Sequence, residues 1–202
     1  MLKQSTPFVA AAILAVLIGS VATAQVDPAW LSSWNDAQSQ RPEILQSQSR
    51  IASEDEPGRP FVIRGMVVTP EGEAAQGVIV HAYHRDQDGV EFESLDNPPS
   101  AWKLHGWAQT DSAGRFEFHT IRPAADNMGR EAAHIHFTLL SEQYGRQWAP
   151  KVFLAEDPLV SADDRKRSEQ AGDFGSVRET KIDTSGIEAI NVKFRLKAEA
   201  DF

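Results

Sequence analysis

The sequence contains no cysteine, and only two of its 202 residues are tyrosines, Tyr83 and Tyr144. Without cysteine the chain can be neither a disulfide-rich scaffold nor a lipoprotein anchored through a modified cysteine. The fold must therefore be stabilised by a packed core or by a bound metal. About 178 residues remain if the N-terminus is processed as expected below, and this length suits one domain with a sizeable core.

Long apolar runs are missing after the N-terminus, because no later stretch approaches the roughly 20 residues needed to cross a bilayer. A basic start, an apolar stretch over residues 8–18 and small residues up to Ala24 predict a secretory signal peptide over residues 1–24, cleaved before Gln25. Gly19 interrupts the apolar run early, which argues against a membrane anchor. We expect an exported, periplasmic protein that has no membrane contact after cleavage.

Positive charge is scarce, since 20 lysines and arginines face 29 aspartates and glutamates, for a formal net charge of −9. This balance argues against nucleic acid or an anionic membrane as a partner. It favours a small molecule or another protein as the ligand.

Short β-rich runs separated by turn residues predict an all-β fold, an antiparallel β-sandwich over residues 61–202. A polar arm and linker over residues 25–60 precede it, with one or two short helices beginning near Asp27-Pro28 and Arg41-Pro42. We expect a hairpin around the turn at residues 111–114 and a short helix and loop within residues 163–175. The expected strands cover residues 61–69, 77–83, 107–110, 115–121, 133–140, 148–154 and 190–196.

Histidine carries the strongest local signal, because all six histidines lie between His81 and His136. His134 and His136 are two residues apart on an expected strand, so both side chains point to the same face. Two imidazoles side by side can reach one metal ion, with nitrogens about 2.0–2.1 Å from it if the metal resembles zinc. For an isolated pair, a polar strand face without a metal is the alternative.

Four motifs around this pair resemble the intradiol ring-cleavage (catechol/protocatechuate) dioxygenase family, in family order from about residue 60 to residue 165. They are Val78-Ile-Val-His-Ala-Tyr-His84 followed by Asp86-Gln-Asp-Gly89, Thr110-Asp-Ser-Ala-Gly-Arg-Phe-Glu-Phe-His-Thr-Ile-Arg-Pro123, Ala133-His-Ile-His-Phe137, and Asp157-Pro-Leu-Val-Ser-Ala-Asp-Asp164.

The resemblance implies a ferric ion held by two tyrosinates and two histidines. It also implies that a catechol binds as a chelate and that both atoms of dioxygen are inserted between its hydroxyl-bearing carbons. His134 and His136 match the family's two histidines.

Neither tyrosine ligand of the family is present, because Glu91 and Asp126 stand at those two positions. The resemblance therefore offers Glu91 and Asp126 as anionic metal ligands, although loop carboxylates beside turns are usually solvated. Two histidines with carboxylates suit Fe(II), Mn(II) or zinc as readily as Fe(III).

Two cationic residues are the catalytic candidates. The family's arginine three residues before the first histidine has become Glu131, with Arg130 next to it, and a glutamine of the later strand has become Lys151. We expect Arg130 and Lys151 to stabilise negative charge on the bound reactants.

The remaining histidines and the tryptophans leave alternatives open. Strand alternation places His81 and Tyr83 on one face and His84 on the other, so at most one of these faces meets the pair. His105 and His119 rank lower as ligands, with His119 expected on a solvent face. Three tryptophans either line an aromatic-binding pocket or pack in the core; they are Trp102, Trp107 and Trp148.

The leading hypothesis is an exported non-haem metal-dependent dioxygenase of the intradiol type, acting with dioxygen on a catechol-like aromatic diol. The cofactor would be iron, Fe(III) by resemblance, with Fe(II) or another divalent metal as alternatives. A second hypothesis is a divalent-metal enzyme of different chemistry, and a third is a non-catalytic β-sandwich binding protein. Residues 25–60 offer a contact for a homo-oligomer, as in many relatives.

Overall fold

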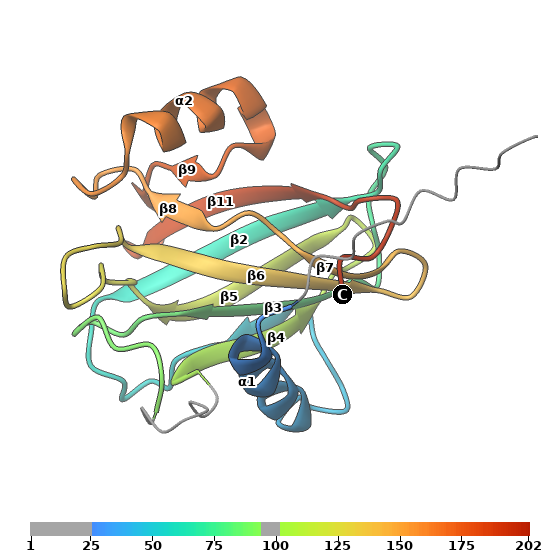
Figure 1. Cartoon of the computed structure of the whole chain (residues 1–202), viewed down its shortest axis with the longest axis horizontal. Coiled ribbons are helices and arrows are strands. Elements are labelled where there is room, and N and C mark those ends of the chain that lie inside the picture. The colour runs from blue at the N-terminus through green and yellow to red at the C-terminus, as the bar shows by residue number, and fades with distance from the viewer. Residues whose placement is uncertain (1–25, 94–101) are drawn as a thin grey trace, which may run out of the picture.

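The computed structural model describes residues 26–93 and 102–202, which form two β-sheets packed face to face, with one α-helix on the outer face of one sheet and a second beside its far edge (Figure 1). The predicted signal peptide, residues 1–24, and its cleavage site before Gln25 lie outside the described residues. Within the described ranges, no helix is long and apolar enough to span a membrane.

The first sheet has five strands. In spatial order they are β1 (Gln48–Arg50), β5 (Arg115–Ile121), β2 (Pro60–Val68), β11 (Glu188–Arg195) and β10 (Lys181–Ile182). The second sheet runs β4 (Leu104–Gln109), β3 (Ile79–His84), β6 (His134–Ser141), β8 (Val152–Leu154) and β9 (Val177–Arg178), and β7 (Gly145–Trp148) pairs with β6. The all-β prediction is thus confirmed, with the strands close to their expected positions.

The sheets are mixed, so the prediction of a purely antiparallel sandwich was wrong. β11 lies parallel to β2 over eight registered pairs, and β1 with β5 and β8 with β9 are also parallel. The alternation of buried and exposed residues is the same in parallel and antiparallel strands. A sequence pattern therefore finds a strand without fixing the direction of its neighbour.

Two further strand predictions need correction. The turn at residues 111–114 forms as expected, with the Asp111 carboxylate accepting from the backbone N–H groups of Ala113 and Arg115 at 2.8 Å. It does not close a hairpin within one sheet, because β4 lies in the second sheet and β5 in the first. The strand expected over residues 148–154 is divided into β7 and β8 around Pro150, which has no backbone N–H for a ladder.

The core lies between the sheets and is formed by every second residue of the central strands. Phe116 and Phe118 of β5 and Ile135 and Phe137 of β6 are all buried there. Gly65 is required by close packing, because a methyl group on its Cα would overlap the Phe116 ring. The outer faces of the sheets are consequently left for polar residues and for the helices.

The helix predicted at Asp27-Pro28 is present as α1 (Pro28–Ser39), with the Asp27 carboxylate capping its N-terminus. It covers the outer face of the second sheet (Figure 1). No helix begins at Arg41-Pro42, because this segment runs extended into β1 and joins the first sheet. At the opposite side, α2 (Ala162–Ala171) and the short η1 (Gly172–Phe174) confirm the helix expected within residues 163–175.

Candidate metal centre

The structure brings His134 and His136 together on the outer face of the second sheet. Ile135 between them is fully buried in the core, so both imidazoles project away from it. Their Nε2 atoms are 2.8 Å apart. Two ligand nitrogens about 2.05 Å from one ion and at right angles to each other would be about 2.9 Å apart. The pair therefore has the spacing of two neighbouring ligands.

The protonation states also suit ligands. His134 Nδ1 lies 2.7 Å from the carbonyl oxygen of Ala132. Because a carbonyl only accepts, Nδ1 carries the hydrogen and the Nε2 lone pair points toward His136. Burial lowers the pKa of both imidazoles, and the positive charges of Lys151 and Arg85 lower them further. Both rings are neutral at pH 7, as a metal ligand must be.

The two tyrosines are not available as phenolates. Burial raises the pKa of Tyr83, whose hydroxyl accepts a hydrogen bond from Trp30 Nε1 at 3.0 Å. Tyr144 lies elsewhere, at the end of β6, with its hydroxyl 3.5 Å from a Glu71 carboxylate oxygen. No tyrosinate pair can be built at the histidines from these residues.

Glu91 forms an ion pair with Arg85, whose charge also acts on both histidines of the pair. Its side chain is 19% exposed, and its Oε2 atom is 3.0 Å from Arg85 Nη2. Burial raises the pKa of Glu91, while the charge of Arg85 opposes that rise. The carboxylate is thus largely shielded from water and has one ion-pair partner.

The Asp126 side chain stabilises the turn that follows it. Its Oδ1 accepts the backbone N–H groups of Arg130 and Glu131, and these bonds lower its pKa. Its Oδ2 is 3.4 Å from Arg130 Nε. In the part of the chain that the structure describes, no three His, Asp or Glu side chains are arranged to hold one metal ion. Of the four ligands predicted from sequence, the structure therefore brings only the two histidines into contact with each other.

The two predicted catalytic cations differ in their surroundings. Arg130 is 71% exposed and pairs with Asp126. Lys151 is half exposed, with Nζ 3.1 Å from Glu131 Oε1, and its charge acts on both histidines. Lys151 is consequently the better placed of the two.

Arg85 is a site residue that the sequence analysis missed. Its Nη2 donates to Glu131 Oε2 at 2.7 Å in addition to Glu91, and its charge lowers the pKa of both histidines of the pair. The signal was present in the sequence, because residue 85 continues the alternation of His81 and Tyr83. That face is the one that carries the pair, since Tyr83 lies directly opposite His136 in the β3–β6 register.

The other histidines lie as strand alternation predicted. His81 is buried on the same face as the pair, with Nε2 3.3 Å from His105 Nδ1. His84 points between the sheets, where its Nε2 is 2.7 Å from the Thr120 hydroxyl and its Nδ1 is 2.7 Å from the carbonyl oxygen of Arg85. Neither is in polar contact with His136.

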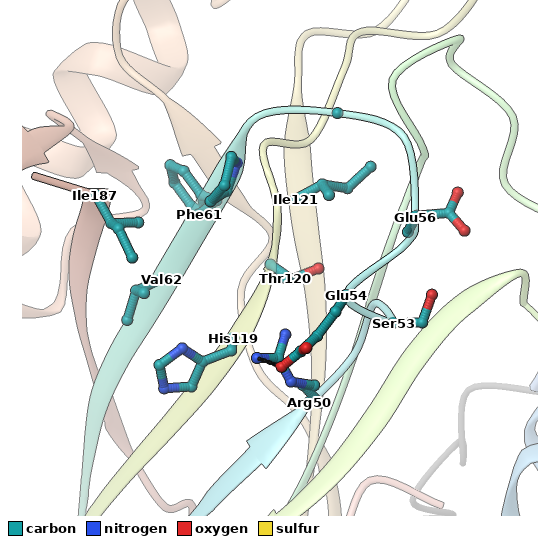
Figure 2. A pocket seen from close by; sticks show the side chains of 12 residues that line it. Arg50, Ser53, Glu54, Glu56, Phe61, Val62, His119, Thr120, Ile121 and Ile187 are labelled. Carbon is teal, nitrogen blue, oxygen red and sulfur yellow. Dashed lines mark hydrogen bonds and ion pairs between the residues drawn. The ribbon is translucent and has the colours of Figure 1, made fainter.

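His119 lies on the outer face of the other sheet, beside a hollow of about 220 Å³ between β1, β2 and β5 (Figure 2). Figure 2 shows the ring near the Arg50–Glu54 ion pair. His119 Nε2 is 2.8 Å from Glu117 Oε1. None of the predicted metal ligands lines this hollow, so His119 is separate from the candidate centre.

The tryptophans pack chiefly as core residues. Trp102 and Trp107 are buried in a cluster beneath α1 together with Trp34. Trp148 is half-buried and stacks on Phe202 at a ring distance of 4.5 Å. The core interpretation therefore holds for Trp102 and Trp107.

Comparisons with known proteins identify the family and the fold of the chain. The family model described as "Dioxygenase" matches residues 35–198. The protocatechuate 3,4-dioxygenase beta chain of Burkholderia cepacia is 25% identical over 115 residues, 52% of this chain and 49% of that one. The chlorocatechol 1,2-dioxygenase of Rhodococcus opacus is 25% identical over 126 residues, 54% of this chain and 49% of that one. The chain thus spans about half the length of these curated relatives.

A solved structure shares the fold. The 3-chlorocatechol 1,2-dioxygenase of Rhodococcus opacus 1CP superposes with a TM-score of 0.58 at 20% identity, over 77% of this chain and 66% of that one. At this identity the likeness concerns the arrangement of the strands.

Proposed function

We propose, from the premise that this chain belongs to the intradiol dioxygenase family, that it is a metal-dependent dioxygenase acting on a catechol-like aromatic diol. The observation that carries the proposal is the 2.8 Å approach of the Nε2 atoms of His134 and His136. Both imidazoles are neutral, His134 is buried and His136 is partly buried, and they project from one strand of a fold similar to that of a chlorocatechol dioxygenase.

The residues present fit a metal ion, though not a ferric ion balanced by tyrosinates. His134 and His136 would hold the ion, and Glu91, whose ion-pair partner Arg85 also acts on both histidines, is the candidate for an anionic ligand. A metal bound there would orient the diol and act as a Lewis acid on its oxygens. The missing phenolates favour a divalent ion on two histidines and a carboxylate, so a divalent-metal enzyme of different chemistry is the second candidate.

The chain's own charged groups support diol binding. Arg85 and Lys151 act electrostatically on both histidines and stand close enough to counter negative charge on diol oxygens. Their partner Glu131 has its pKa lowered to about 2, first by its hydrogen bond from Arg85, and so remains ionised. This shared carboxylate holds the two cations on the same side of the pair.

Metal retention and oxygen consumption test the proposal together. Purified protein loaded with Fe(II) and dialysed should retain about one metal ion per chain and consume dioxygen when catechol is added. His134→Ala and His136→Ala should lose both properties, whereas His119→Ala, a histidine on the other sheet, should keep them. A wild-type protein that retains no metal would refute the proposal and favour a non-catalytic binding protein.

Visible absorption distinguishes a ferric site with tyrosinate ligands from a site with a carboxylate ligand. Because neither tyrosine can act as a ligand, an Fe(III)-loaded sample should lack the purple-red band of tyrosinate-to-iron charge transfer. Such a band would contradict the carboxylate-containing site.

Export is a separate proposal, supported by the signal-peptide pattern of residues 1–24. Expression of the full chain in a bacterial host should give a periplasmic protein whose N-terminus is Gln25. An unprocessed protein that stays in the cytoplasm would contradict it.

A further inference from the structure

The two histidines of the pair are held in different ways. His134 is oriented by the bond of its Nδ1 to the carbonyl oxygen of Ala132. His136 has no such bond within residues 26–93 and 102–202, where its polar contact is the one with His134 Nε2. Metal-bound histidines usually need a second contact that fixes the ring. Some other group must therefore set the plane of His136.

The ring of Tyr83 lies against the imidazole of His136. Tyr83 lies directly opposite His136 in the antiparallel pairing of β3 with β6. The two rings are stacked with centroids 4.5 Å apart and planes only 4° from parallel. Rotating the imidazole about its Cβ–Cγ bond would break this contact, so the stack holds the direction in which Nε2 points.

Tyr83 is itself fixed on two further sides. Trp102 stacks on the phenol ring at 3.8 Å and 19°. Trp30 of α1 donates from Nε1 to the Tyr83 hydroxyl at 3.0 Å and packs against Trp102. Tyr83 is 3% exposed, so it has little freedom to move away from these partners. Tyr83 thus connects α1 to His136, because it is hydrogen-bonded to Trp30 of the helix and stacked on the imidazole.

We propose that Tyr83, anchored by Trp30 and Trp102, is the positioning residue for His136, and that α1 thereby helps set metal affinity. The inference rests on the proposed function, in which His136 is a metal ligand. Tyr83 takes no part in the reaction itself, because its neutral, hydrogen-bonded hydroxyl points to α1. The Tyr83 ring orients His136 by stacking on it, whereas most metal-bound histidines are oriented by a hydrogen bond.

Zinc affinity of the full chain tests this role without depending on turnover. A titration of Zn²⁺ against a chromogenic chelator should show Tyr83→Phe within about threefold of wild type, since the ring remains. Tyr83→Met keeps the bulk but lacks the flat ring, and it should bind zinc about 10-fold more weakly, the lower end for loss of an outer contact. Tyr144→Met, at the tyrosine distant from the pair, is the matched control and should bind like wild type.

A double-mutant cycle keeps the test valid if Tyr83→Met fails to fold. Trp30→Phe and Tyr83→Phe remove the same hydrogen bond, so the double variant should lose no more zinc affinity than the weaker-binding single variant. Fully additive losses, or two single variants that both bind zinc as tightly as wild type, would overturn the anchoring of Tyr83 by α1.

The outcomes separate the two proposals. Wild-type protein without zinc affinity would overturn the proposed function and this inference together. Wild-type protein that binds zinc, with folded Tyr83→Met binding equally well, would overturn only the positioning role.

Discussion

Acidification should destabilise this protein strongly through His84, the histidine enclosed between the two sheets. Burial lowers its pKa from 6.5 to about 4, against a smaller opposing effect of the Arg85 carbonyl. The bond to that carbonyl makes Nδ1 the donor, so Nε2 accepts from the Thr120 hydroxyl. Protonating Nε2 would reverse that bond, with the Thr120 hydroxyl turning to accept, and would place a positive charge in the enclosed space between the sheets. The neutral ring is thus part of the folded state.

The direction and size of the effect follow from proton linkage. Because the folded pKa lies below the unfolded one, the unfolded chain binds more protons between about pH 6.5 and pH 4. Stability from the neutral His84 is present above pH 6.5 and is lost as the pH falls through this window. The complete shift corresponds to about 3 kcal/mol, and the part lost between pH 7 and pH 5 to about 2 kcal/mol.

Urea denaturation at pH 7 and pH 5 measures this loss. Other buried histidines also have lowered pKa values and contribute in the same direction, including His81 and His136. The comparison is therefore between wild type and His84→Gln, whose amide does not titrate. His84→Gln should be less stable at pH 7 and should lose about 2 kcal/mol less than wild type on going to pH 5.

Ile63→Val supplies the control, because it removes one buried methyl group from the core and leaves every titrating group in place, so it should keep the wild-type pH dependence. Equal losses in wild type and His84→Gln between pH 7 and pH 5 would refute the assignment of His84 as a neutral, buried base.

Two further predictions concern the framework around the centre. Gly65→Ala should lower the free energy of unfolding by about 1–3 kcal/mol, because its methyl group would overlap the Phe116 ring in a tightly packed core; an unchanged urea midpoint would contradict this. Asp157→Ala should cost about 1–3 kcal/mol, because the Asp157 carboxylate accepts the N–H of Ala133, the residue before the histidine pair, at 2.9 Å. Thermal unfolding measures that loss, and an unchanged midpoint would argue that water replaces the carboxylate.

Sequence alone predicted the parts of this fold that depend on local pattern. The positions of β2, β5 and β11 follow from alternation of apolar residues, and the placement of His134 and His136 on one face of the sheet follows from their spacing. The two-residue strands β9 and β10 are too short to show a period. Their pairing depends on where longer elements place them.

Strand alternation places Arg85 on the face of the histidine pair, but its ion pairs depend on tertiary contacts that a local pattern does not show. Arg85 meets Glu131 across 46 positions of sequence, and Trp30 meets Tyr83 across 53. Asp126 was predicted as a ligand because of its place in a motif. The backbone N–H groups that occupy its carboxylate became visible only once the following turn was folded.

Of the two carboxylates offered as ligands, Glu91 is the one with fewer contacts to give up before it could bind a metal. Asp126 would have to give up two backbone hydrogen bonds, whereas Glu91 would give up one ion pair, and Arg85 would keep Glu131 as its partner. Glu91→Gln should weaken zinc binding at least about 10-fold, or about 1.4 kcal/mol.

Asp126→Asn keeps an oxygen for the turn, so it should leave zinc affinity unchanged in the same chelator titration. The reverse result, with Asp126→Asn binding weakly and Glu91→Gln binding like wild type, would mean that the turn opens when metal binds. In that case Asp126, and not Glu91, would be the metal ligand, and the number of contacts in the folded chain would be a poor guide to which carboxylate binds.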